Sequence, residues 1–224
     1  MNKKVILHNT SEFGMNCLVY SPENCENLPM IVYLHGAGER GTVIEHLYRH
    51  GLAKMMNKGL DIPAVVVCPQ CPAWAVWDNV VDKVKGLIDS VAKEFSVDMS
   101  RITVTGSSMG GYGTFMMGLT YPNFFAGIAP VAGGGMSWRA IRLRNTPVLA
   151  VHGVKDGVVP FIYSELMVDI LKNSGRNVEL ISLKNFDHND GIDFAYRCTK
   201  LISWLLAQKR KDFDYVQDVC EDCF

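Results

Sequence analysis

The chain alternates between short runs rich in β-branched residues and segments whose apolar residues have helical spacing. Several of the short runs are apolar on both faces, as expected of strands in the interior of a parallel sheet. Parallel strands are joined through right-handed crossovers, which place helices on both faces of the sheet. We therefore expect an α/β fold with a mostly parallel central sheet. The runs expected to form strands are 16–21, 29–36, 63–70, 101–108, 127–133, 147–153 and 177–183.

Three longer segments have the pattern of amphipathic helices. In residues 78–95 apolar side chains recur at intervals of three and four. Residues 160–175 begin with a proline and end with a glycine, which are favoured at the start and the end of a helix. Residues 192–208 form the third segment, and a fourth helix is expected in 110–122. These helices supply the covering layers of the sheet.

The length and composition favour one domain. The chain has 224 residues, of which 48% are hydrophobic and 20% are charged. This is ordinary globular composition, and α/β domains often exceed 200 residues. We expect a single α/β domain over 1–208 and a polar C-terminal extension over 209–224.

The charge and hydropathy of the chain exclude several partner classes. The formal net charge is −1, so there is no electrostatic argument for nucleic acid or an anionic membrane as partner. No apolar run approaches the roughly 18 residues of a membrane span. Residues 1–16 contain only a three-residue apolar stretch and do not resemble a signal peptide. We expect a cytoplasmic protein, and the oligomeric state is left open.

The seven cysteines include two C-x-x-C pairs, Cys68 with Cys71 and Cys220 with Cys223. Four thiolates can hold zinc, but Cys68 closes an apolar strand and the second pair lies in the polar tail. A thioredoxin-like redox role is equally disfavoured because neither pair opens a helix in a βαβ unit. We expect no metal and no organic cofactor.

The stretch Gly106-Ser107-Ser108-Met109-Gly110 fits the pattern G-x-S-x-G between an expected strand and an expected helix. A serine held on such a sharp turn needs empty space two residues to either side, which Gly106 and Gly110 provide. The alternative is a phosphate-binding turn, but neither Walker nor G-x-G-x-x-G spacing is present. Ser108, centred between the glycines, is the predicted nucleophile, and Ser107 is the weaker candidate.

Hydrolytic triads built around such a turn follow the chain order Ser, Asp or Glu, His. Only His152 and His188 follow Ser108, and no acid at a strand end lies between Ser108 and His152. His188, on the loop after 177–183, is the predicted general base. Asp156, three residues past the end of a strand, is the predicted orienting acid.

The segment YLHGAGERG, 33–41, ends the strand expected within 29–36, at residues 30–34. Acyl transfer needs backbone N–H groups directed at the developing oxyanion, one from the residue after the nucleophile and one from a loop of this kind. Those donors are predicted to be Met109 and Ala37. His35 is expected to pack beneath the site in a structural role.

These segments resemble the α/β-hydrolase superfamily, over nearly the whole chain. More narrowly, the chain is similar to small esterases related to dienelactone hydrolases, phospholipase/carboxylesterases and feruloyl-esterase-like proteins known as predicted peptidases. The resemblance implies an α/β-hydrolase fold with Ser108, Asp156 and His188 as the triad. Serine replaces the cysteine nucleophile of true dienelactone hydrolases, and the propeller of prolyl oligopeptidases is missing. The motifs are LHGAGERG, 34–41; CPQCP with nearby tryptophans, 68–77; RITVTGSSMGGYGTF, 101–115; VHGVKDGVVP, 151–160; and DH, 187–188.

The substrate is expected to be a small-molecule carboxylic ester that enters an open cleft. The segment 134–146 is too short for a large lid domain. Aromatic and basic side chains on loops around the cleft are candidates for the substrate pocket, although each tryptophan can equally anchor a loop. Thioesterase or acyltransferase activity, peptidase activity and a non-catalytic binding role remain alternatives. The pocket candidates are Arg40, Trp74, Trp77, Trp138 and Phe186.

Overall fold

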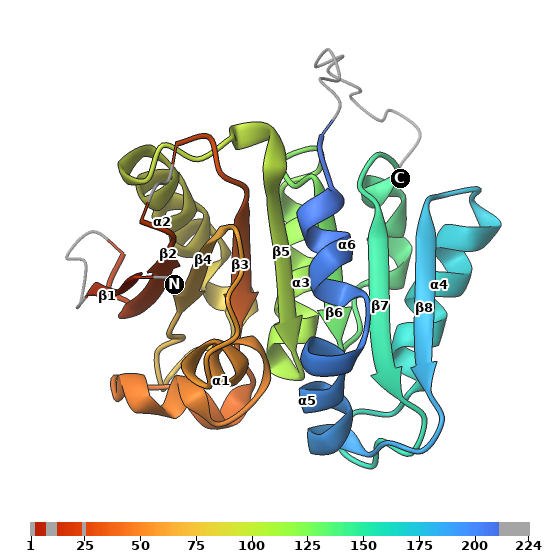
Figure 1. Cartoon of the computed structure of the whole chain (residues 1–224). Helices are drawn as coiled ribbons and strands as arrows, with labels where there is room; N and C mark the ends of the chain where they lie inside the picture. Colours follow the sequence, from red (N-terminus) through yellow and green to blue (C-terminus); the bar gives the residue numbers. More distant parts are fainter. Residues whose placement is uncertain (1–2, 8–12, 24–25, 211–224) are drawn as a thin grey trace.

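The computed structural model describes residues 3–7, 13–23 and 26–210. They contain one eight-stranded sheet with the order β1-β2-β4-β3-β5-β6-β7-β8 (Figure 1). β2 is antiparallel to β1 and β4, and every pairing from β4 to β8 is parallel. The strands are β1 Lys3–Leu7, β2 Cys17–Ser21, β3 Met30–Leu34, β4 Val65–Pro69, β5 Ile102–Ser107, β6 Gly127–Val131, β7 Val148–Gly153 and β8 Val178–Leu183.

Within the described residues, six α-helices cover the two faces of this sheet. α2, α3 and α4 lie on one face, and α1, α5 and α6 lie on the other (Figure 1). The division matches two buried apolar clusters, one containing Leu87, Phe115 and Met167 and the other Leu52 and Leu201. The helices are α1 Gly51–Asn57, α2 Val81–Glu94, α3 Met109–Thr120, α4 Ile162–Asn173, α5 His188–Cys198 and α6 Leu201–Ala207.

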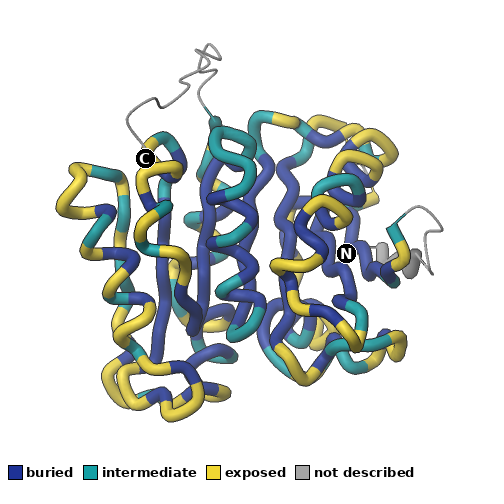
Figure 2. Tube along the Cα trace, turned by 180° about the vertical axis from the view of Figure 1, so that it is seen from behind, coloured by how far each residue is buried: buried dark blue, intermediate teal, exposed yellow. Residues whose placement is uncertain are grey.

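This architecture is the predicted α/β fold with helices on both faces and no large lid. All seven predicted strands are present, and β1 is an additional strand whose pairing extends one edge. Strands β2 to β7 are buried along their whole length, whereas the edge strand β8 is partly exposed. The helices alternate between buried and exposed positions (Figure 2). The segment between β6 and β7 contains only the short 3-10 helix η5, Ser137–Leu143.

The helix predicted over 192–208 is in fact two helices that meet at Thr199 and Lys200. Thr199 has extended backbone angles, with φ −102° and ψ 175°. Its hydroxyl donates to the Ala195 carbonyl at 2.6 Å and accepts from the Leu201 amide at 3.2 Å. A threonine hydroxyl that bonds to the backbone in this way competes with the hydrogen bonds of the helix and can interrupt it. The helix therefore breaks here, although the apolar periodicity of the sequence continues.

The predicted boundary at residue 208 falls one residue after the end of α6. Most of the predicted extension over 209–224, with Cys220 and Cys223, lies outside the described residues. Cys68 and Cys71 are buried free thiols. Among the described residues, no helix has the length and apolar character needed to cross a membrane. The same ranges hold no cluster of three or more His, Cys, Asp or Glu side chains suited to a metal ion.

Candidate active site

Ser108 occupies a strained turn between β5 and α3. Its backbone angles are φ 57° and ψ −119°, a region that residues other than glycine rarely adopt. The surrounding backbone holds the turn, because the Ser108 amide donates to the Val131 carbonyl at 3.0 Å. The Ser108 carbonyl in turn accepts from the Gly111 amide at 2.8 Å. This geometry presents the Ser108 side chain at the carboxyl edge of the sheet.

The elbow depends on the absence of side chains at Gly106 and Gly110. A Cβ at Gly106 would lie 2.4 Å from the Gly110 carbonyl oxygen, and one at Gly110 would lie 1.8 Å from the Leu34 carbonyl oxygen. Both contacts are with backbone, which cannot rotate away. The predicted reason for this glycine spacing is therefore confirmed.

The two adjacent serines have different surroundings. Ser107 is 1% exposed, and its hydroxyl lies 3.0 Å from the hydroxyl of Tyr33. Ser108 is half-buried, and its Oγ lies 2.9 Å from Nε2 of His188. Only the second serine is both accessible and paired with a base.

His188 lies at the start of α5, where the side chain of Asp187 accepts from the Asp190 amide and begins the helix. The Nδ1 atom of His188 lies 2.6 Å from Oδ2 of Asp156. The structure thus brings Ser108, His188 and Asp156 together in one hydrogen-bonded chain. Residues from the ends of β5, β7 and β8 meet because the strands are parallel and their carboxyl ends share one edge.

The carboxylate of Asp156 is held at both oxygens. Its Oδ1 accepts from the amides of Val158 at 2.9 Å and Val159 at 2.8 Å, and its Oδ2 faces His188. Burial raises the pKa of Asp156, but hydrogen bonds from His188 and the two amides outweigh it and leave the pKa below its usual range. Asp156 is therefore ionised and fixed in orientation.

The loop after β3 lies directly against the elbow. A Cβ at Gly36 would be 3.5 Å from the Cβ of Ser108, which is van der Waals contact. Ala37 is exposed and begins the 3-10 helix η1, Ala37–Glu39, while Met109 begins α3. The first N–H groups of a helix have no acceptor within that helix. The two predicted donors thus lie at positions where a backbone N–H is available to a ligand.

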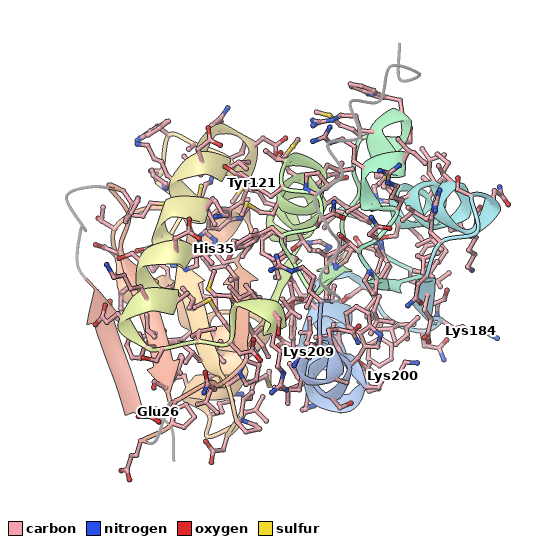
Figure 3. All side chains as sticks on the ribbon, turned by 90° about the horizontal axis from the view of Figure 1, so that it is seen from above. Glu26, His35, Tyr121, Lys184, Lys200 and Lys209 are labelled. Carbon is pink, nitrogen blue, oxygen red and sulfur yellow. The ribbon has the colours of Figure 1, made fainter. Side chains whose placement is uncertain are left out.

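His35 forms the fully buried floor of this loop, as the sequence predicts. Its Nδ1 lies 2.6 Å from the Gly36 carbonyl oxygen, and its Nε2 accepts from the Cys71 amide at 2.9 Å. Burial lowers the pKa of His35 to about 4, so the imidazole is neutral. Figure 3 shows His35 in the interior, whereas the labelled Glu26 and Lys184 lie at the periphery.

Arg40 fastens the same loop rather than facing a substrate carboxylate. Its Nε donates to the Ala37 carbonyl at 3.0 Å, and its Nη1 donates to the Ala75 carbonyl at 3.2 Å. These bonds connect the loop after β3 with the loop after β4. The guanidinium therefore helps to hold Ala37 in place.

Trp77 is not a pocket residue, contrary to the prediction. It is 1% exposed, and its indole N–H donates to the His35 carbonyl at 2.9 Å. A Cβ at Gly113 of α3 would lie 2.6 Å from Trp77. Trp77 is buried because Gly113 of α3 leaves space for it. The two residues meet only in the tertiary fold.

The other aromatic candidates differ in exposure. Trp74 is 73% exposed and Trp138 is 80% exposed; they lie on the segments after β4 and β6. Phe186 is half-buried and contacts Phe194, with 4.4 Å between the ring centroids. The two exposed tryptophans remain available to a ligand, whereas Phe186 is partly engaged in the apolar cluster between the sheet and α5.

Glu39 is a buried acid beside Ser108 that the sequence motifs did not indicate as part of the site. Its Oε2 lies 3.1 Å from the position that a Gly36 Cβ would take, close to Ser108. Burial is the main cause that raises the pKa of Glu39, although Arg49 and His188 oppose it. No motif spacing identifies such a residue, because an acid in a glycine-rich loop is ordinarily exposed.

The elbow, the order of the triad residues along the chain and the sheet topology define the α/β-hydrolase class. Within this class the chain belongs to the phospholipase/carboxylesterase family, whose model matches residues 73–194, more than half of the chain. The match extends from the loop after β4, across the elbow and Asp156, to α5 with His188.

Individual relatives agree with this assignment. The chain is 47% identical over 123 residues to poly(3-hydroxyalkanoate) depolymerase C of Paucimonas lemoignei, covering 48% of this chain and 28% of the relative. It is 31% identical over 129 residues to acyl-protein thioesterase 1 of Mycosarcoma maydis, covering 50% and 52%. The crystal structure of a thermostable esterase matches 93% of this chain and 63% of its own, with 26% identity and a TM-score of 0.76. The chain thus spans less than two thirds of each of these proteins.

Proposed function

We propose that the protein is a carboxylic ester hydrolase that acts through Ser108, His188 and Asp156. The observation that carries the proposal is the unbroken hydrogen-bonded chain from an accessible serine on a strained turn to a buried carboxylate. Such a chain is the arrangement that activates a serine hydroxyl as a nucleophile. Membership of the phospholipase/carboxylesterase family supports the same chemistry.

In the first half of the reaction Ser108 Oγ attacks the ester carbonyl carbon. The hydroxyl proton passes to Nε2 of His188 as the new carbon–oxygen bond forms. His188 then returns that proton to the oxygen of the departing alcohol, and the bond between carbonyl carbon and alcohol oxygen breaks. The product that remains is an ester of Ser108, the acyl-enzyme.

In the second half a water molecule takes the place of the alcohol. His188 removes a proton from the water, whose oxygen attacks the acyl carbon. The bond to Ser108 Oγ then breaks, and the proton returns to that oxygen, releasing a carboxylic acid. Asp156 keeps the imidazole in the required orientation throughout and stabilises its protonated form.

The amides of Ala37 and Met109 are proposed to stabilise the oxyanion that forms in both halves. The contact between Gly36 and the elbow supports this role, as does the fastening of Ala37 by Arg40. A preorganised pair of N–H donors costs no rearrangement when the negative charge develops, and one donor contributes roughly a hundredfold or more to kcat.

The exposed tryptophans on the loops after β4 and β6 favour esters with an apolar portion. The segment between β6 and β7 supplies only η5 and no covering domain. We propose that Trp138 on η5, Trp74 and the half-buried Phe186 contact the apolar part of the substrate. Because Trp74 and Trp138 are mostly exposed, they are not part of the core and can form an apolar binding surface.

A second candidate activity is thioester hydrolysis, favoured by the similarity to acyl-protein thioesterase 1. Thioesters use the same nucleophile, base and oxyanion donors, and only the leaving group differs. Comparison of kcat/KM for matched oxygen esters and thioesters of one acyl chain separates the two activities.

The proposal is tested by labelling the protein with a fluorophosphonate, which phosphonylates activated serines, and locating the adduct by mass spectrometry. We expect the adduct on Ser108 and no labelling of the Ser108→Ala variant. Ser107→Ala is the matched control, because Ser107 is buried on the same turn and contacts Tyr33 rather than His188. Unlabelled Ser108 in folded protein, or ester hydrolysis that survives Ser108→Ala, would refute the proposal.

A further inference from the structure

A second histidine lies against the carboxylate of Asp156. His152, in β7, is 1% exposed, and its Nε2 lies 3.2 Å from Oδ2 of Asp156 and 3.0 Å from the Val159 carbonyl oxygen. The opposite ring nitrogen, Nδ1, lies 2.8 Å from the hydroxyl oxygen of Ser164 in α4. Both nitrogens therefore have partners at hydrogen-bond distance in the interior of the protein.

The partners determine where the hydrogen of this imidazole lies. The Val159 carbonyl oxygen and the ionised Asp156 carboxylate can only accept hydrogen bonds. If Nε2 carried no hydrogen, its lone pair would face these two acceptors, which is unfavourable. On the other side of the ring, the Ser164 hydroxyl donates its one hydrogen to the Gly133 carbonyl oxygen at 2.7 Å. Burial is the main cause that lowers the pKa of His152, which favours the neutral ring. A neutral ring with hydrogen on Nε2 opposes one pair of acceptors, Nδ1 and the Ser164 oxygen. Hydrogen on Nδ1 would oppose Nε2 to two acceptors, one of them charged.

We propose that His152 is a positioning residue of the triad, whose Nε2–H is shared between the Val159 carbonyl oxygen and Oδ2 of Asp156. This inference rests on the proposed function, since it concerns the acid of the same triad. Oδ1 of Asp156 accepts two backbone amides, and Oδ2 then accepts two imidazoles, so the carboxylate cannot rotate away from His188.

The residues that hold His152 come from elements around the site. Ser164 lies in α4, and Phe161 packs its ring edge against His152 with 5.5 Å between centroids. Ser164 also contacts the Gly133 carbonyl, and a Cβ at Gly133 would lie 2.5 Å from the carbonyl carbon of Gly111 in α3. The chain of contacts thus leads from the acid back to the helix that carries the nucleophile. It fixes the Asp156 loop relative to the elbow.

The direct test is the tautomer of His152 in the unreacted, full-length protein. Long-range ¹H–¹⁵N correlation spectra of ¹⁵N-histidine-labelled protein distinguish the two ring nitrogens, and the His152→Gln variant assigns the signals. We expect hydrogen on Nε2 at neutral pH. A ring protonated on Nδ1 alone would overturn the inference. The measurement needs no turnover, so its result is separate from that of the fluorophosphonate experiment.

Two substitutions separate positioning from packing. Glutamine places an amide N–H near the position of His152 Nε2, whereas asparagine reaches only the position of Nδ1. We expect His152→Gln to retain most of kcat/KM and His152→Asn to lose roughly tenfold, as for a lost hydrogen bond to a charged group. Equal losses in both variants, or no loss in either, would contradict the inference.

The pH profile gives a readout that packing alone would not change. The titratable groups facing Asp156 are His188, His152 and, from α3, Tyr112. Without the donor from His152, more of the carboxylate charge acts on His188 and favours its protonated form. The acidic limb of kcat/KM should therefore move to higher pH in His152→Asn and stay in place in His152→Gln. An unmoved limb in both variants would count against the donor role.

Discussion

Oγ of Ser108 lies 2.9 Å from Nε2 of His188, although 80 residues separate them in the chain. The contact exists because β5 and β8 end at the same edge of a parallel sheet. Each crossover between them returns the chain to the opposite edge, so that successive strands end on the same side. Asp156 extends the contact on the far side of the imidazole.

Asp156→Asn should lower kcat by about 10³- to 10⁴-fold. The amide retains an oxygen for the backbone amides of Val158 and Val159, but it no longer selects the tautomer of His188 that accepts the serine proton. Steady-state hydrolysis of a chromogenic ester measures the loss, and circular dichroism confirms the fold. Asp187→Asn is the control: it alters the neighbouring acid, whose oxygen caps α5, and should leave kcat near that of the wild type. Equal losses in both variants would remove Asp156 from the triad.

Gly110→Ala should destabilise the protein by about 3 kcal/mol or prevent folding, because the added methyl group would overlap the Leu34 carbonyl. Gly157→Ala, on the exposed loop after β7, meets no atom within 4 Å and should change the free energy of unfolding by less than about 0.5 kcal/mol. Chemical denaturation measures both. Similar stabilities for the two variants would contradict the steric account of the elbow.

Trp77→Ala and Trp138→Ala should separate stability from substrate binding. Trp77 is buried against α3, so its truncation should lower the free energy of unfolding by about 3–5 kcal/mol. Trp138 is 80% exposed, and its truncation should leave stability nearly unchanged but raise KM for esters with a long apolar acyl chain. Acetyl esters provide the comparison substrate. If Trp138→Ala raised KM equally for both ester types, the proposed apolar contact would be wrong.

The stability of the protein should increase with pH between about 4 and 6.5 through His35. The pKa of this imidazole falls from 6.5 to about 4 because it is buried. The unfolded chain therefore binds more protons in this window, and the free energy of unfolding falls as the pH decreases through it. The full effect of such a shift is about 3 kcal/mol. Urea denaturation at a series of pH values should show a shallower dependence for His35→Gln than for the wild type; parallel curves would exclude His35 as the source.

Local sequence patterns predicted much of the fold. β-branched runs bounded by turn residues predicted all the central strands, because residues buried on both faces leave a continuous apolar signal. The elbow was predictable for a steric reason, since two glycines spaced around a serine are needed wherever a strand turns sharply into a helix. The helix break at Thr199 was not predictable from periodicity, because the apolar pattern continues through it.

The sequence by itself determined the α/β class, the turn that presents Ser108 and the order of the candidate triad residues along the chain. These follow from constraints within a few residues or from the rule that parallel strands end at one edge. Only the tertiary structure decided which side chains the core encloses. Trp77 became buried because Gly113 leaves room for it, and Glu39 and His152 came to lie beside the site through contacts between distant segments. Burial depends on what the rest of the chain places around a residue, and no local pattern records that.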